Sequence, residues 1–236
     1  IYQEQTKVGY MYAGLSYANP VYYGHDNLGC ADCHMTAESP TEQANHNFAV
    51  VEKDGSGIIT AIASQKCVEC HDGEHALFVA ASQVGSTQNI WNGTASVATT
   101  VTAQMATDAA TEMEHEAHSY QVAIDALAAE LTTAGTTPTA GYPYFSGSAT
   151  DQGHGGAMHN WSYLHHEPGG FAHNRFYVKR LIFDSIDWLT NDDGTPAAAG
   201  ARILSGTITL DATGTTYTDA IAWLGGNATT GVITRP

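Results

Sequence analysis

The sequence predicts a mainly helical fold with much coil and a few short β-strands. Two stretches, residues 104–131 and 171–189, repeat apolar residues at helical spacing. Between them, residues 132–160 are rich in Gly, Thr, Pro and Ser, a composition typical of loops. The chain has 236 residues, of which 43% are hydrophobic. This length and composition allow one sizeable core, or a compact domain with a smaller appendage.

The first expected elements are a β-hairpin and a long helix. The turn sequence Asp54-Gly55-Ser56-Gly57 stands between two short apolar runs, which indicates a hairpin. The helix over residues 104–131 would bury a stripe formed by Met113, Ala117, Tyr120, Ile124, Leu127 and Leu131. His115 and His118 flank this stripe among glutamates. We therefore expect them on a solvated polar face rather than at a metal site.

The C-terminal half is expected to hold a second helix and a segment of short strands. The helix over residues 171–189 has an apolar stripe of Val178, Leu181, Ile182, Ile186 and Leu189. From about residue 201, short strands are expected around Ile203, Ile208 and Leu210 and in the Thr-rich stretch 212–218. We expect a main domain over residues 1–190, and a Gly/Thr-rich segment over 191–236 that packs on it or on a neighbour.

The charge balance restricts the possible partners. Asp and Glu total 24 against 8 Lys and Arg, giving a formal net charge of −16. This balance argues against nucleic acid as a partner. No apolar run reaches the length of a membrane span. No basic segment leads into an apolar signal region, so we interpret the sequence as a mature exported chain.

All four cysteines belong to two short motifs, which are Cys30-Ala-Asp-Cys33-His34 and Cys67-Val-Glu-Cys70-His71. In a C-x-x-C-H motif the thiols form thioethers with haem, and the adjoining His is the proximal ligand of the iron. The motifs predict two haem c groups, each with its iron, and a dihaem cytochrome c fold organised around them. Because this attachment takes place outside the cytoplasm, we expect an extracellular or cell-surface protein, or alternatively a periplasmic one.

Two other uses of paired cysteines are less consistent with the spacing. Zinc ribbons separate their C-x-x-C pairs by about 15–20 residues, whereas 33 residues lie between Cys33 and Cys67. A zinc site also gives no reason for a His after both pairs. A thioredoxin-like dithiol needs a βαβ framework, which the sequence does not show. The motifs therefore favour haem.

The ligand on the far side of each iron decides between electron transfer and small-molecule chemistry. Of the 12 histidines, only two belong to the motifs, so the surplus favours bis-His ligation. The candidate distal ligands are His46, His173 and His25. His46 lies between the two motifs, and His173 opens the second expected helix. His25 precedes Cys30 by five residues and can serve a haem of this chain or of a neighbour.

The order of these features resembles the multihaem c-type cytochromes of dissimilatory metal-reducing prokaryotes, which include subunits of extracellular cytochrome filaments (nanowires). The resemblance covers about residues 20–190. It comprises the first motif with Met35, then His46-Asn47-Phe48, the second motif, a helix, and Phe171-Ala172-His173-Asn174. It implies that His46 and His173 are distal ligands. Members of that family usually carry more haems, so the resemblance also implies stacking with other copies, for which His25 and the tyrosine-rich N-terminus are candidate contacts.

The expected function is electron transfer rather than catalysis. The chain would be a subunit of a polymeric haem chain, exchanging electrons with redox partner proteins or extracellular electron acceptors. The alternative is a dihaem peroxidase or a small nitrogen-oxide reductase with one open haem site. The Lys-ligated haem of pentahaem nitrite reductases has no counterpart, because the sequence has no C-x-x-C-K motif. A third hypothesis is an interaction module that docks on a larger oxidoreductase.

Overall fold

The computed structural model describes residues 8–18, 34, 49–64, 83–91, 96–191, 204–213 and 216–236. The chain divides into two compact units. Unit 1 comprises Ile1 and His25–Glu116, and unit 2 comprises Tyr2–Gly24 and Ala117–Pro236. The boundary between Glu116 and Ala117 falls inside helix α3 (Ala103–Thr133). Among the described residues helices dominate and the strands are short, which confirms the expected mainly helical class.

The described part of unit 1 contains two antiparallel hairpins. The predicted hairpin is confirmed as β1 (Val51–Lys53) paired with β2 (Ile59–Ile62). Its turn is held by Asp54, whose Oδ1 accepts from the N–H of Ser56 at 2.8 Å and of Ile58 at 3.0 Å. The second hairpin, β3 (Thr87–Trp91) with β4 (Ser96–Thr100), was not expected from the sequence.

The described part of unit 1 buries a small apolar cluster on the N-terminal part of α3. Its members are Ile62, Val101, Ala106 and Ala109. The backbone N–H of Ile59 also donates to Glu114 Oε2 on the helix at 2.8 Å. The β1–β2 hairpin is thus joined to α3 by one hydrogen bond to a carboxylate and by a few apolar contacts.

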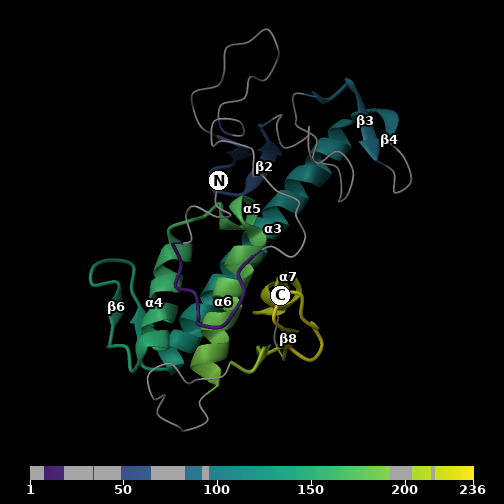
Figure 1. Cartoon of the computed structure of the whole chain (residues 1–236). Helices are drawn as coiled ribbons and strands as arrows, with labels where there is room; N and C mark the ends of the chain where they lie inside the picture. Colours follow the sequence, from purple (N-terminus) through teal and green to yellow (C-terminus); the bar gives the residue numbers. More distant parts are fainter. Residues whose placement is uncertain are drawn as a thin grey trace. The chain divides into compact units, whose positions relative to one another are not determined.

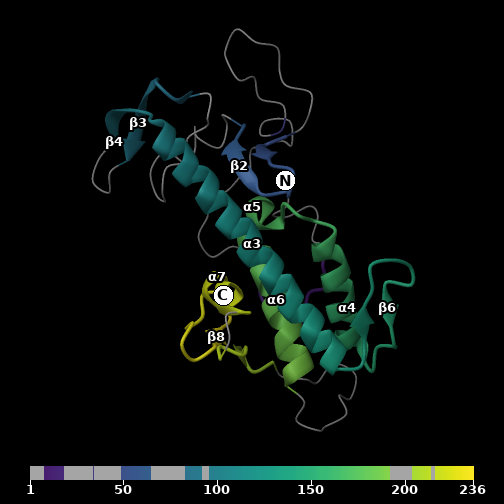
Figure 2. The ribbon, with the colours of Figure 1, turned by 180° about the vertical axis from the view of Figure 1, so that it is seen from behind.

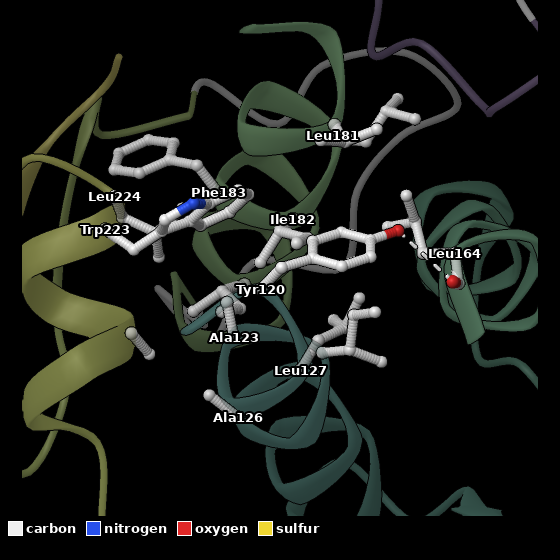
Figure 3. Close-up of a cluster of buried hydrophobic side chains, with 14 of the residues drawn as sticks. Tyr120, Ala123, Ala126, Leu127, Leu164, Leu181, Ile182, Phe183, Trp223 and Leu224 are labelled. Atoms are coloured by element: carbon white, nitrogen blue, oxygen red, sulfur yellow. Dashed lines mark hydrogen bonds between the residues drawn. The ribbon is translucent and has the colours of Figure 1, made fainter. Parts of the chain in front are cut away.

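Unit 2 is built on three helices that lie alongside one another: the C-terminal part of α3, α4 (Gln152–His165) and α6 (Arg175–Thr190) (Figures 1 and 2). Their facing side chains form one core, in which Tyr120, Leu127 and Ile182 lie together (Figure 3). The predicted helix over 104–131 is confirmed. Its stripe is buried from Tyr120 onward, whereas Met113 and Ala117 are half-buried, and His115 and His118 are exposed as expected.

Helix α4 corrects the expectation of a loop over residues 132–160. Asp151 caps its N-terminus, because its Oδ1 accepts from the N–H of His154 at 2.8 Å. A Cβ on Gly153 would lie 2.0 Å from Trp188 Cε2, and one on Gly156 would lie 2.1 Å from Tyr10 Cδ1. The glycines that lower the helix propensity of this stretch are therefore required by close packing.

The single helix expected over residues 171–189 is two helices, α5 (Gly170–His173) and α6. Asn174 separates them with φ −156° and ψ 71°, and its side chain accepts from the N–H of Tyr177 at 3.2 Å. An Asn at this position caps the following helix and interrupts the preceding one. His173 thus ends α5 instead of opening the long helix. In the predicted stripe, Val178, Leu181, Ile182 and Ile186 are buried, whereas Leu189 is half-buried.

The N-terminal segment 8–18 packs on α4 and α6. The N–H of Tyr10 donates to Asn160 Oδ1 at 2.6 Å, and Asn160 Nδ2 donates back to the carbonyl of Tyr10 at 3.0 Å. The hydroxyl of Tyr12 donates to the carbonyl of Gly153 at 3.0 Å. These bonds hold the segment across the helices although it is distant from them in sequence.

The C-terminal residues complete the core of unit 2. Strands β7 (Thr207–Thr209) and β8 (Val232–Thr234) pair antiparallel, with α7 (Thr218–Trp223) between them in sequence. The strand around Ile208 is confirmed, whereas Leu210 and the described residues of 212–218 form no strand. The expected strand at Ile203 lies outside the described residues. Two further short strands, β5 (Thr137–Pro138) and β6 (Phe145–Ser146), pair before α4. The assignment of residues 1–190 as a haem domain stays a prediction.

The C-terminal segment is also tied to α6 by a buried ion pair. Arg235 donates from Nε to Asp184 Oδ1 at 2.7 Å and from Nη2 to Oδ2 at 2.9 Å. Asp184 is fully buried, and its carboxylate raises the pKa of Arg235. The two parallel hydrogen bonds fix the register of the segment on the helix.

Candidate functional site

Most of the predicted haem-site residues lie outside the described residues. These are Cys30, Cys33, Cys67, Cys70, His71, His46 and His25. His34 is described as a half-buried helical residue of unit 1, and His173 as a half-buried residue of unit 2. The described geometry of a candidate ligand therefore comes mainly from His173.

The imidazole of His173 is held by a carboxylate and by the backbone beneath it. Its Nδ1 lies 2.9 Å from Glu167 Oε1, with the two side chains 35% and 20% exposed. A Cβ on Gly169 would lie 2.7 Å from His173 Cε1, so the ring occupies space that any other residue at position 169 would fill. The short helix α5 brings these groups together, because the N–H of His173 donates to the carbonyl of Gly169 at 2.9 Å.

The backbone of Glu167 is anchored to the core of unit 2. Its carbonyl accepts from the hydroxyl of Tyr120 at 3.1 Å and from the N–H of Gly170 at 3.0 Å. The same hydroxyl lies 3.2 Å from the carbonyl of Leu164, the bond drawn in Figure 3. Burial raises the pKa of Tyr120, so its hydroxyl remains a donor. The carboxylate beside His173 therefore projects from a fixed point of the backbone.

This arrangement fits a haem iron. A histidine that ligates a metal typically donates its other ring N–H to a carboxylate, a carbonyl or a water. Because Glu167 is an acceptor, the hydrogen bond assigns the proton of a neutral His173 to Nδ1 and its lone pair to Nε2. Nε2 is a nitrogen through which imidazole binds iron. The donor set at His173 is thus of the kind that an axial ligand requires.

His154 shows the contrasting arrangement of a packed histidine. It is 2% exposed, and its Nε2 lies 2.8 Å from Thr136 Oγ1. The N–H of Thr150 donates to its Nδ1 at 3.4 Å. Both ring nitrogens have protein partners, so His154 joins the start of α4 to the segment after α3. These contacts give His154 a packing role within unit 2.

Two further histidines occupy exposed positions. His118 Nε2 lies 3.5 Å from Asp219 Oδ2, with the two side chains 57% and 41% exposed. His165 stacks on Trp161 at a centroid distance of 4.7 Å and an interplanar angle of 13°. Within the described ranges, no three His, Cys, Asp or Glu side chains form a group that could hold a metal ion.

Sequence reasoning missed Glu167 as a partner of His173. The two residues are six apart, and the end of α4, a turn and α5 lie between them, so no helical or strand period links them. The available signal was a single carboxylate in the run His165-His166-Glu167-Pro168-Gly169-Gly170, ahead of a candidate ligand. The glycine pair was a further sign of close packing at this point.

The similarity of the chain to curated proteins defines its family. Two complete C-x-x-C-H motifs, a surplus of histidine and sequence relatives over most of the chain show that it belongs to the multihaem c-type cytochromes. The relatives are the C-type polyheme cytochromes OmcB and OmcC of Geobacter sulfurreducens. OmcB is 33% identical over 262 residues, covering 93% of this chain and 30% of its own length. OmcC is 37% identical over 221 residues, covering 85% of this chain and 28% of its own length.

The chain therefore spans less than a third of the length of these curated relatives. No family model matches the chain, and no solved structure matches it.

Proposed function

We propose that this chain transfers electrons through two covalently bound haem c groups. The haems are attached at Cys30 and Cys33 and at Cys67 and Cys70, with His34 and His71 as proximal ligands. One observation carries the proposal: all four cysteines of the chain lie in two C-x-x-C-H motifs. The chain also belongs to the multihaem c-type cytochromes. A haem iron that cycles between ferric and ferrous states carries one electron without any substrate chemistry.

The distal ligands in this proposal are His173 and His46, with His25 as a ligand to a haem of this chain or of a neighbouring copy. The geometry of His173 supports its role, because Glu167 accepts from Nδ1 and the ring is seated on Gly169. Two imidazole ligands close both sides of an iron and give a lower potential than a His/Met pair. The proposed protein is therefore a carrier with both haems low-spin.

Spectroscopy of the haem-loaded chain tests this proposal. The haem content should be two per polypeptide, and the ferric electron paramagnetic resonance spectrum should be entirely low-spin. Replacement His173→Ala should convert one of the two haems to a high-spin form that binds carbon monoxide when reduced. His118→Ala is the matched control and should leave both haems low-spin. A high-spin haem in the unsubstituted chain would instead support a dihaem peroxidase or a small nitrogen-oxide reductase.

The proposal extends to assembly and location. Two haems span a short distance, and the relatives are named polyhaem, so we propose that copies of the chain stack into a continuous haem chain at the cell surface or outside the cell. Among the described helices, none combines the length and apolarity that a membrane span needs.

Negative-stain microscopy across salt and pH tests whether copies of the chain stack. A uniformly monomeric sample would contradict it, and copurification of a stoichiometric oxidoreductase would support the docking module instead.

A further inference from the structure

We propose that Glu167 positions His173 and sets the reduction potential of the haem that His173 binds. This inference rests on the proposed ligand role of His173. The carboxylate accepts a hydrogen bond from Nδ1–H of His173, with 2.9 Å between Nδ1 and Oε1. This bond fixes both the tautomer and the rotation of the ring. Glu167 does not reach the iron, so it is a positioning residue that acts through the imidazole.

The charge of Glu167 gives it an effect beyond positioning. If the haem bound by His173 were oxidised by a redox partner, the positive charge beside the imidazole would rise by one, with no bond made or broken. A carboxylate hydrogen-bonded to the axial imidazole stabilises this extra charge and makes the imidazole a stronger donor. The ferric state gains more than the ferrous state, so Glu167 lowers the potential of this haem relative to a neutral acceptor.

The surroundings of Glu167 and His173 hold the carboxylate in place and limit the screening of its charge. Glu167 is 20% exposed, so water screens its charge only in part. Tyr120 holds its carbonyl from the core, and a Cβ on Gly170 would lie 2.5 Å from that hydroxyl. Thus the carboxylate, the ring and the backbone between them form one rigid group within unit 2.

A second described histidine–carboxylate pair provides an internal control. His118 and Asp219 are separated by 3.5 Å and are more exposed, at 57% and 41% of their side-chain surface. Neither belongs to the proposed ligand set. Asp219→Asn removes the same charge from the same unit without touching His173, so it reports the effect of net charge alone.

The test is a spectroelectrochemical titration of the haem-loaded chain with three substitutions at position 167. Glu167→Gln keeps the shape and an acceptor but removes the charge. We expect the ferrous-to-ferric ratio of one haem at a fixed potential to rise about tenfold, equal to about 59 mV for a one-electron couple. Glu167→Ala should shift it at least as far. Glu167→Asp retains the charge and should lie closer to the unsubstituted chain, while Asp219→Asn should shift neither haem.

Each outcome decides the inference. Equal potentials in Glu167→Gln and the unsubstituted chain would overturn it, as would equal shifts in Glu167→Asp and Glu167→Gln, because charge would then not be the cause. The His173→Ala spectrum separates this failure from that of the proposed function. If both haems stay low-spin in His173→Ala, the ligand assignment itself is wrong. Circular dichroism of each variant shows that unit 2 keeps its helices.

Discussion

Unit 2 and the described part of unit 1 differ in how they bury apolar side chains. Unit 2 has a core to which α3, α4, α6, α7, β7 and β8 all contribute. In the described part of unit 1, the buried cluster is Ile62, Val101, Ala106 and Ala109. Both C-x-x-C-H motifs belong to unit 1. We infer that side-chain packing stabilises unit 2, and that the haems supply much of the apolar surface that stabilises unit 1.

The largest expected effect follows from removing the haem attachment. A chain with Ser at positions 30, 33, 67 and 70 should lose both haems, and residues 25–116 should become sensitive to protease, with cleavage faster by about tenfold or more. Unit 2 should keep its helices, because its core is formed by packed apolar side chains. Limited proteolysis with mass mapping measures this difference. First cleavage within residues 117–236 would contradict the comparison, and the two-haem chain is the control.

The second prediction concerns the ion pair that ties the C-terminal segment to the core of unit 2. Asp184→Ala leaves Arg235 without its fully buried partner and should lower the free energy of unfolding by about 3–5 kcal/mol. Asp219→Ala removes an exposed partner of His118 and should change it by no more than about 0.5 kcal/mol. Urea denaturation followed by circular dichroism gives both values, and equal losses would contradict the burial argument.

The third prediction uses the glycines of α4. Ala normally stabilises a helix interior relative to Gly by about 0.5–1 kcal/mol. Gly155→Ala should show this gain, because its Cβ would meet Ala149 Cβ at an ordinary 3.6 Å. Gly156→Ala should instead destabilise unit 2 by about 1–3 kcal/mol, because its Cβ would lie 2.1 Å from Tyr10 Cδ1. Gains at both positions in thermal denaturation would show that Tyr10 does not pack closely on α4.

The smallest expected effect is a loss of stability at alkaline pH. Burial foremost raises the pKa of Tyr12 above its ordinary value of about 10. The stability that the buried, neutral Tyr12 contributes is fully present below pH about 10. It is lost as the pH rises toward the folded-state pKa, because Tyr12 then ionises only in the unfolded chain. The loss should be about 1.4 kcal/mol per pH unit. Tyr12→Phe should flatten this slope in denaturation series from pH 9 to 11, and an unchanged slope would contradict the assignment.

Sequence patterns predicted the parts of the fold in which local preference and packing agree. The helix over residues 104–131 and the hairpin at Asp54 belong to this group, since periodic side chains and turn residues specify them directly. Helix α4 was missed because Gly153 and Gly156 oppose helix formation locally and are needed only for contacts with Trp188 and Tyr10. Those partners are far away in the sequence, so no local pattern reports them.

Some residues of the candidate site can likewise be predicted from a local motif, whereas others depend on tertiary packing. The proposed thioether cysteines and their adjoining histidines can be predicted from the C-x-x-C-H motif alone, because the attachment chemistry requires that spacing. His173 was named from its sequence context, but the break at Asn174 and the partner Glu167 depend on how α4, α5 and α6 meet. Side-chain geometry of that kind comes from tertiary packing, which periodicity does not encode.

The attachment of residues 8–18 to α4 has a consequence for the order of folding. Tyr10 and Asn160, joined by two hydrogen bonds, are 150 residues apart in the sequence. Residues 25–116 of unit 1, with both C-x-x-C-H motifs, lie between them in the sequence. The N-terminal segment can close onto α4 only after that stretch has been made, and loop closure slows such a contact further. We infer that, in the proposed dihaem chain, haem attachment at both motifs can take place before the N-terminal segment packs on α4.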